Sequence, residues 1–157
     1  MVEFLLKEKE WTIGLVADSK RLLEVALSPS AKRRLRVRGN AGPTPVLRKA
    51  ERMLRLYLRE RRPLGNIPVD WSRQSPFQRK VLRCVRRIPL GEVRSYGWVA
   101  RRIGKPKGAR ACGQALRRNR FPLFIPCHRV VGRIDLGGFS CGIRLKKKLL
   151  VHERGNR

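Results

Sequence analysis

The sequence is poor in acidic residues. Among its 157 residues, 39 lysines and arginines face only 11 aspartates and glutamates, which gives a formal net charge of +28 at pH 7. A surface with so one-sided a charge repels itself, and a polyanionic partner would screen that repulsion. The composition therefore indicates nucleic acid as the partner, although scaffold proteins of the ribosomal type and proteins bound to anionic membranes share it.

Long apolar runs are also missing. The opening stretch MVEFLLKEKEWTIG interrupts its short apolar run with charges, unlike a secretory leader. No stretch approaches the roughly 20 apolar residues of a membrane-spanning helix. We therefore expect a soluble, cytoplasmic protein with no membrane partner.

Cysteine and histidine are scarce. The four cysteines are spread singly without a C-x-x-C pair, and the only histidines are His128 and His152. This spacing is poor for a zinc site and unlike a secreted disulfide framework. We expect no metal and no cofactor, while a disulfide among Cys84, Cys112 and Cys141 remains open.

The first third of the chain has the pattern of strands followed by a helix. The apolar runs WTIGLVA (11–17) and LLEVAL (22–27) predict two strands joined by a turn at DSKR. The basic stretch 28–43 predicts an exposed strand or loop. A helix is expected over 44–62, with Thr44 as its N-cap and apolar residues at helical spacing.

The second half has mainly helical patterns. Ser75-x-x-Gln78 is a capping box in front of an amphipathic run. Two short helices are expected over 95–103 and 107–118, and their tight connection predicts a DNA-binding helix-turn-helix. 

The expected fold class is α+β, with two domains. A small strand-rich domain with one helix would span residues 1–68, and a mainly helical domain would span 69–157. The stretch PLGNIPVDW (63–71) marks the boundary because its prolines and glycine cannot continue a helix.

The second of the two short helices carries arginines among small residues. Arg110, Arg117 and Arg118 can reach phosphates, while Ala109 and Gly113 let the backbone approach a surface closely. The pattern predicts contact with DNA or RNA. An ordinary solvated helix that packs on its small face remains the alternative.

Cys127 lies in the stretch IPCHRV, directly before a histidine. A cysteine thiol is mostly protonated at neutral pH, so a nucleophilic cysteine needs a base or positive surroundings. His128 could supply the base, and a carboxylate such as Glu153 could orient an imidazole. Because cysteine is often buried, FIPC could equally be a strand that enters a core with an inert thiol.

Five motifs follow one another in the second half: PLGEVRSYGWVA, KGARACGQALRRN, IPCHRVVG, GGFSCG and LLVHE. Their order over Ser75 to Glu153 resembles that of the O6-alkylguanine-DNA alkyltransferases, and IPCHRV is the most specific of them. The resemblance implies a protein that binds double-stranded DNA through the minor groove, flips an O6-alkylguanine out of the stack and takes the alkyl group irreversibly on Cys127. We expect it to act as a monomer, and cooperative binding along DNA remains open.

The resemblance also implies roles for individual residues. Arg110 would insert into the stack where the base has left, and Tyr96 would rotate the nucleotide and donate a hydrogen bond to the departing guanine. Asn119 would buttress the active-site turn. His128 would act as base through a water molecule, and Glu153 would hold its imidazole.

A substrate pocket and a DNA-contacting helix follow from the same resemblance. The backbone carbonyls of Cys127 and Val130 would read the guanine amino group, and Ser140 would line the loop over the lesion oxygen. The expected pocket residues are Val130, Phe139, Ser140, Pro122 and Trp98, and the expected DNA contacts are Arg110, Tyr96, Ala109, Gly113, Arg117 and Arg118.

The chain departs from the family pattern in a few places. Phe139 stands where many relatives carry tyrosine, Cys141 where glycine is common, and Arg120 where proline is usual, which would add charge near DNA. Some members bind zinc through an N-terminal domain, but this chain has no cysteine or histidine before Cys84. The adjacent glycines at 137 and 138 predict a tight turn or a close approach to another group more than a phosphate loop.

Three other functions remain as alternatives. A related protein could recognise alkylguanine without repairing it, although such relatives lack the cysteine. An architectural DNA-binding protein would carry an inert thiol, and a cysteine protease would need a peptide groove that nothing in the sequence indicates.

Overall fold

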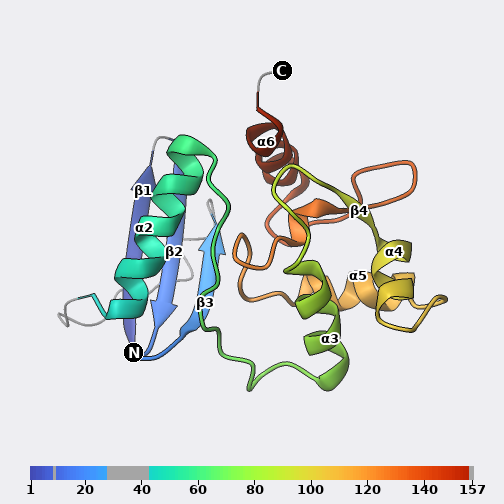
Figure 1. Ribbon diagram of the computed structural model, residues 1–157, viewed down its shortest axis with the longest axis horizontal. Helices are drawn as coiled ribbons and strands as arrows, with labels where there is room; N and C mark the ends of the chain where they lie inside the picture. Colours follow the sequence, from blue (N-terminus) through green and yellow to red (C-terminus); the bar gives the residue numbers. More distant parts are fainter. Residues whose placement is uncertain (9, 28–42, 156–157) are drawn as a thin grey trace. The chain divides into compact units, whose positions relative to one another are not determined.

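The computed structural model describes residues 1–8, 10–27 and 43–155, and it has an α+β fold, as expected (Figure 1). Residue contacts divide the chain into two compact units. Unit 1 holds residues 1–70 and 120–124, and unit 2 holds residues 71–119 and 125–157. The domain boundary expected at residue 68 stays a prediction. The basic segment 28–42 lies outside the described residues.

Unit 1 contains a three-stranded antiparallel sheet. Its strands are β1 (Val2–Glu8), β2 (Trp11–Ala17) and β3 (Leu22–Leu27), in that spatial order. The predicted turn after β2 is confirmed, because Asp18 Oδ1 accepts hydrogen bonds of 2.8 Å from the backbone N–H groups of the second and third residues that follow it. The sequence patterns predicted β2 and β3 but did not single out β1.

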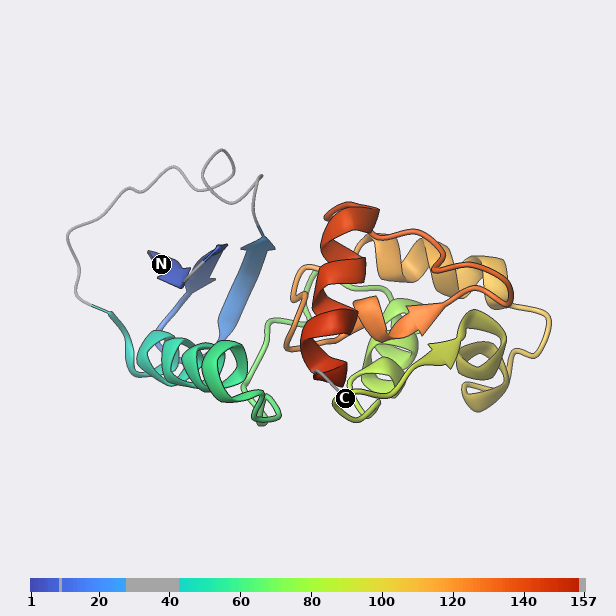
Figure 2. The ribbon, with the colours of Figure 1, turned by 90° about the horizontal axis from the view of Figure 1, so that it is seen from above.

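One helix, α2 (Pro45–Glu60), lies across one face of this sheet (Figures 1 and 2). Thr44 caps it as predicted, since its side-chain oxygen accepts a hydrogen bond from the backbone N–H of Leu47 at 3.3 Å. The buried side of α2, which includes Leu47, Leu54 and Tyr57, packs into the core of the unit. The period-3.6 pattern of the sequence therefore identified the correct face.

The short segment Arg120–Phe124 joins unit 1 through edge contacts with β3. The backbone N–H of Val25 donates to the carbonyl of Arg120 at 2.8 Å. The side chain of Arg120 forms an ion pair of 2.9 Å with Glu24. Arg120 was expected to add charge near DNA, but its charge is paired with an acidic side chain of the sheet.

Unit 2 is mainly helical. Its elements are α3 (Pro76–Val85), β4 (Arg94–Ser95), α4 (Tyr96–Arg102), α5 (Ala109–Arg117), the 3₁₀ turn η1 (Cys127–Arg129), β5 (Val130–Val131) and α6 (Ile143–Arg154). The capping box in front of α3 is confirmed in both directions by Ser75 and Gln78. The stretch FIPC is buried, but it forms no strand and leads instead into η1.

The helix-turn-helix is formed by α4 and α5, which contact each other. Ser95 caps α4, because its hydroxyl accepts a hydrogen bond from the N–H of Trp98 at 3.0 Å. Figure 2 shows α6 beside the segment that contains η1 and β5, and the helix contacts η1 directly. Of the helices in residues 1–8, 10–27 and 43–155, none has the length and apolar character needed to span a bilayer.

The capping box provides a test of local stability. We expect Ser75→Ala to lower the free energy of unfolding by about 1 kcal/mol, because an N-terminal N–H of α3 loses its acceptor. Ser75→Asp keeps an oxygen at the cap and should retain most of the stability. Urea unfolding of both variants checks this, and equal losses in the two would contradict the capping role.

Candidate functional site

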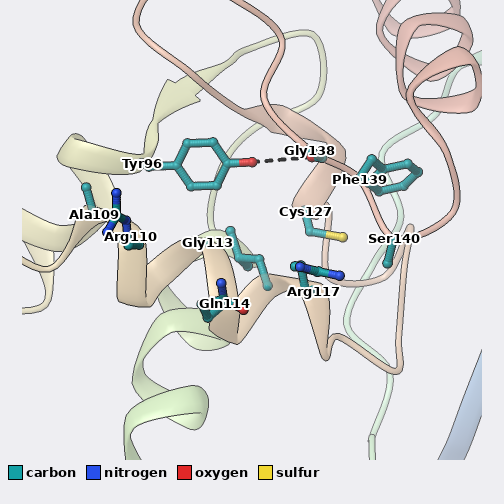
Figure 3. A pocket seen from close by; sticks show the side chains of 11 residues that line it. Tyr96, Ala109, Arg110, Gly113, Gln114, Arg117, Cys127, Gly138, Phe139 and Ser140 are labelled. Carbon is teal, nitrogen blue, oxygen red and sulfur yellow. Dashed lines mark hydrogen bonds between the residues drawn. The ribbon is translucent and has the colours of Figure 1, made fainter.

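A pocket of about 410 Å³ opens in unit 2 beside α5 (Figure 3). Its volume lies within the roughly 300–1,000 Å³ typical of small-molecule sites. Side chains from α4, α5, η1 and the loop before α6 line it: Tyr96, Ala109, Arg110, Gly113, Gln114, Leu116, Arg117, Cys127, Gly138, Phe139 and Ser140.

Cys127 contributes its thiol to the wall of this pocket (Figure 3). The side-chain amide of Asn119 donates to the sulfur at 3.1 Å and to the carbonyl of Ile125 at 2.9 Å. One amide thus fixes both the thiol and the turn that presents it. Burial raises the pKa of Cys127 to about 11, although the Asn119 hydrogen bond opposes this shift. The thiol is therefore protonated at neutral pH in the free protein.

Behind the thiol, His128 and Glu153 form a fully buried pair. Nε2 of His128 lies 2.7 Å from Oε1 of Glu153. Because the carboxylate accepts the proton on Nε2, the other ring nitrogen, Nδ1, is left as an acceptor in the neutral ring. Nδ1 has no hydrogen-bond partner among the described residues.

Arg129 completes the buried network. Its Nε and Nη2 donate to the two oxygens of Glu153, each at 2.8 Å, and its Nη1 donates to the carbonyl of Ile88 at 2.6 Å. The backbone N–H of Gly91 also donates to Glu153, at 3.2 Å. From the sequence alone, Arg129 is a positive charge two residues after the thiol. Its bidentate contact with Glu153 depends on α6, which is distant along the chain.

These contacts set the charge states of the pair. Burial raises the pKa of Glu153, but the hydrogen bonds from His128 and Arg129 outweigh burial and hold it well below its ordinary value. Burial lowers the pKa of His128, and the bond to Glu153 only partly offsets it. The resting site therefore holds a carboxylate and a neutral imidazole.

Lys146 is a site residue that the sequence interpretation missed. Its ammonium donates to the carbonyls of Val130 at 2.6 Å and Gly138 at 3.0 Å, and it lies 5.8 Å from the centre of the Tyr96 ring. Burial lowers its pKa to about 8, while the charges of Cys127 and Asp135 oppose the shift. 

The spacing of α6 contained the signal for Lys146. Lys146, Leu149, Leu150 and Glu153 recur at helical spacing and are all buried. A lysine in line with two core leucines and a buried carboxylate belongs to the inward face.

The loop over the pocket is held close to Tyr96. Gly137 has φ of +65°, and a Cβ at this position would lie 2.7 Å from a carbon of the Tyr96 ring. The phenol also donates to the carbonyl of Gly138 at 3.3 Å (Figure 3). The prediction of a close approach to another group is confirmed at Gly137.

The structure brings together most of the residues that were expected at the site. Tyr96, Ala109, Arg110, Gly113, Arg117, Cys127, Phe139 and Ser140 all line the pocket, together with Gln114 and Leu116, which were not predicted. Arg118 is exposed at the C-cap of α5 and does not line it. 

Three of the expected pocket residues lie elsewhere. Trp98 lines a different hollow, because it is two residues beyond Tyr96 on α4 and so points to the opposite side of that helix. Pro122 lies in the segment Arg120–Phe124, which belongs to unit 1. Val130 is buried and does not line the pocket, and its carbonyl accepts a hydrogen bond from Lys146.

All four cysteines are free, so the disulfide left open among Cys84, Cys112 and Cys141 is not formed. Residues 1–8, 10–27 and 43–155 contain no cluster of three or more histidine, cysteine or acidic side chains that could hold a metal ion. 

The family model for the DNA-binding domain of 6-O-methylguanine DNA methyltransferase matches residues 76–155. The chain belongs to this family. The match covers about half of the chain and includes every side chain that lines the pocket. The resemblance drawn from the five motifs is thereby confirmed.

Curated members of the family are similar over the same half. A constitutive methylated-DNA–protein-cysteine methyltransferase of Bacillus subtilis is 44% identical over 57% of this chain and 54% of its own length. A methylated-DNA–protein-cysteine methyltransferase of Saccharomyces cerevisiae is 41% identical over 60% of this chain and 50% of its own. The chain thus spans about half the length of the curated relatives it matches.

Solved structures of the family are similar over nearly the whole chain. O6-methylguanine methyltransferase of Mycobacterium tuberculosis has a TM-score of 0.84 at 28% identity, covering 98% of this chain and 92% of that one. A structure of the OGT of the same organism in complex with DNA has a TM-score of 0.82 at 29% identity, with coverage of 98% and 93%. The methyltransferase of Methanococcus jannaschii, at 31% identity, has a TM-score of 0.69 over 98% and 95%.

The buried carboxylate yields a prediction about stability. Glu153→Gln should lower the free energy of unfolding at pH 7 by about 3–5 kcal/mol, because Arg129 is left buried without its counter-charge. The depressed pKa of Glu153 contributes stability above its ordinary value of 4.5 that is lost as the pH falls below it. The difference in the free energy of unfolding between wild type and Glu153→Gln should therefore become smaller from pH 7 to pH 3.5, as measured by urea unfolding.

Glu92→Gln is the matched control, since Glu92 pairs with Arg94 at the surface of the same unit. Its effect on unfolding should be small at every pH. If Glu153→Gln lowers the free energy of unfolding by the same amount at pH 7 and at pH 3.5, the pKa of the Glu153 carboxyl is not depressed.

Proposed function

We propose that this protein transfers the alkyl group of an O6-alkylguanine in double-stranded DNA, chiefly O6-methylguanine, to its own Cys127. The observation that carries the proposal is the position of that thiol, in the wall of a pocket of about 410 Å³ whose outer side is the arginine-bearing helix α5. A nucleophile, a cavity for a planar base and a nucleic-acid contact thus occupy one place. The names of the relatives, methylated-DNA–protein-cysteine methyltransferases, support the same reaction.

The charge of unit 2 supports DNA as the partner. Residues 71–119 and 125–157 hold 22 of the 39 lysines and arginines but only three acidic residues: Glu92, Asp135 and Glu153. Glu153 is buried against Arg129, and Glu92 pairs with Arg94. The field outside this unit is therefore strongly positive, which favours association with phosphate backbones.

The pocket side of α5 fits a narrow groove. Ala109 and Gly113 present almost no side chain there, while Arg110 and Arg117 can reach phosphates. We infer that α5 enters the minor groove and that the protein acts on it as a monomer. The thiol lies within the pocket wall, so the guanine must leave the stack to reach it.

Two residues at the mouth of the pocket would promote this rotation. Arg110 is exposed at the start of α5 and would fill the space that the base leaves in the duplex. Tyr96 lies across the pocket, and burial raises the pKa of its phenol, which keeps it a hydrogen-bond donor. It would exchange its contact with Gly138 for one with the leaving guanine.

The transfer itself is a displacement at carbon. The thiol proton of Cys127 passes to Nδ1 of His128 through a water molecule, and Glu153 stabilises the imidazolium that forms. A bond forms between the sulfur and the alkyl carbon as the bond from that carbon to O6 breaks. The electron pair of the broken bond stays on the purine. The purine takes up one proton and so becomes unmodified guanine, still attached to its DNA strand.

Two features of the site suit a single turnover. The product is a thioether, which a histidine and a carboxylate do not hydrolyse, so each molecule is consumed by one lesion. The raised pKa of Cys127 keeps the thiol unreactive until a lesion is bound. The backbone carbonyls of Cys127 and Val130 would read the guanine amino group, and Ser140 would line the loop over the lesion oxygen.

The deciding experiment is the mass of the protein after incubation with a duplex that contains one O6-methylguanine. We expect a gain of one methyl group per protein, located on the Cys127 peptide and saturating at one equivalent. Cys127→Ala should still bind the duplex but gain no mass. Binding without transfer by the wild-type protein would instead favour a lesion-recognition module, and transfer by the variant would move the reaction to another thiol.

The role of Arg110 can be separated from the chemistry. Arg110→Ala should slow transfer from O6-methylguanine in duplex DNA by about tenfold or more while leaving the reaction with free O6-benzylguanine nearly unchanged, because the free base needs no flipping. Single-turnover rates on the two substrates measure this. Equal losses on both would remove the wedge role, and Arg118→Ala, at the far end of α5, is the matched control.

A further inference from the structure

A second hollow, of about 610 Å³, lies between α3 and α4 in unit 2. Five of its ten lining residues are cationic, and none is acidic. They are Lys80, Arg83, Cys84, Arg87, Ile88, Pro89, Arg94, Trp98, Arg102 and Ile103. The alkyl transfer uses none of them.

Trp98 organises this basic hollow. The indole is half-buried, and the guanidinium groups of Arg94 and Arg102 lie 5.4 and 5.9 Å from its ring centre. Contacts at this distance hold a cation over an aromatic ring without neutralising it. Two arginines are thus partly ordered before any ligand arrives, which lowers the entropy cost of binding an anion.

A row of cations runs along α3 on the other side of the hollow. Lys80, Arg83 and Arg87 follow one another at spacings of three and four residues, so they share one face of the helix and its end. Lys80 and Arg83 lie about 4.5 Å apart along the helix axis, at 1.5 Å per residue, and Arg87 follows just beyond the end of the helix. Such a row suits a chain of phosphates better than a single small anion.

Little negative charge opposes this row. Arg94 forms an ion pair with Glu92, which does not line the hollow. The other acidic residues of unit 2 lie elsewhere: Glu153 is buried with Arg129, and Asp135 is in the loop beside the alkyl-acceptor pocket. At least four cations remain to attract an anion.

The hollow is separate from the alkyl-acceptor pocket. The two share no lining residue. They also lie on opposite sides of α4, because Tyr96 faces one and Trp98, about 200° further round the helix, faces the other. A duplex whose minor groove holds α5 is therefore not the natural occupant of the basic hollow.

We propose that this basic hollow binds the phosphate backbone of a second segment of DNA. Five cationic and no acidic side chains line the hollow, so backbone phosphates rather than a nucleobase would be recognised. The inference goes beyond alkyl transfer, since an undamaged duplex would serve as ligand. One molecule could then hold a lesion-bearing duplex at α5 and another stretch of DNA at the hollow between α3 and α4.

The test uses two reporters in ¹H–¹⁵N spectra of the full chain. The indole N–H of Trp98, assigned with Trp98→Phe, reports on the hollow, and the amide of Gly113 reports on α5. Undamaged duplex DNA should shift both signals. Arg87→Gln/Arg102→Gln, which changes two exposed side chains, should abolish the Trp98 shift and keep the Gly113 shift.

The salt dependence of duplex binding gives a second measure. Loss of two phosphate contacts should reduce the slope of log K against log salt by about 1.8. The matched control, Lys49→Gln/Arg52→Gln, removes the same charge from exposed positions on α2 and should change the slope much less. Far-UV circular dichroism confirms that each variant is folded.

Every other outcome overturns the proposal. A Trp98 signal that does not move with duplex, or that moves equally in the double variant, would exclude the hollow as a DNA site. A shift with sodium tripolyphosphate but not with duplex would assign it to small polyphosphates. Equal salt-dependence slopes in the two double variants would show that the hollow contributes only through the net charge of the protein. None of these results depends on whether Cys127 accepts an alkyl group.

Discussion

The carboxylate of Glu153 is the contact on which the site depends. It lies in the interior of unit 2, where an unpaired charge would be prohibitively costly, and it is compensated by Arg129, by His128 and by the backbone of Gly91. These partners come from the 3₁₀ turn and from the loop after α3. One anion thereby joins three separate parts of the chain behind the thiol, and it fixes the orientation of the imidazole.

The burial that surrounds this network also keeps the Cys127 thiol protonated and therefore weakly nucleophilic. Desolvation raises the pKa of Cys127 and lowers that of His128, so both groups favour their neutral form at the site. Lys146, whose pKa is lowered to about 8, still carries its charge at neutral pH. A protein consumed by the proposed single turnover would gain from this arrangement, because small electrophiles would meet a protonated thiol. In the proposed transfer, the thiolate would form when a bound base brings a carbon to the sulfur and the thiol proton moves to the imidazole of His128.

Local patterns predicted much of this structure, and the failures have one cause. The caps at Thr44 and Ser75 and the helix-turn-helix depend on neighbouring residues, so they could be read directly. The motif around Cys127 and His128 identified the family. Lys146 and Arg129 were undervalued because their contacts form only when α6 packs beside the turn. Trp98 was assigned to the wrong side of α4 because its place was taken from the motif and not from the helical period.

The distribution of acidic residues explains why the charge excess does not prevent folding. In unit 1, Glu8 lies between Arg55 and Arg59, Asp18 pairs with Arg21, and Glu24 pairs with Arg120. Most of the few acids thus stabilise the sheet and its helix. Unit 2 places its one buried acid behind the thiol and leaves its surface basic. Like charges on that surface repel one another, and bound DNA would relieve this repulsion and release its counterions. The shortage of acidic residues is therefore the physical basis of the proposed affinity for DNA.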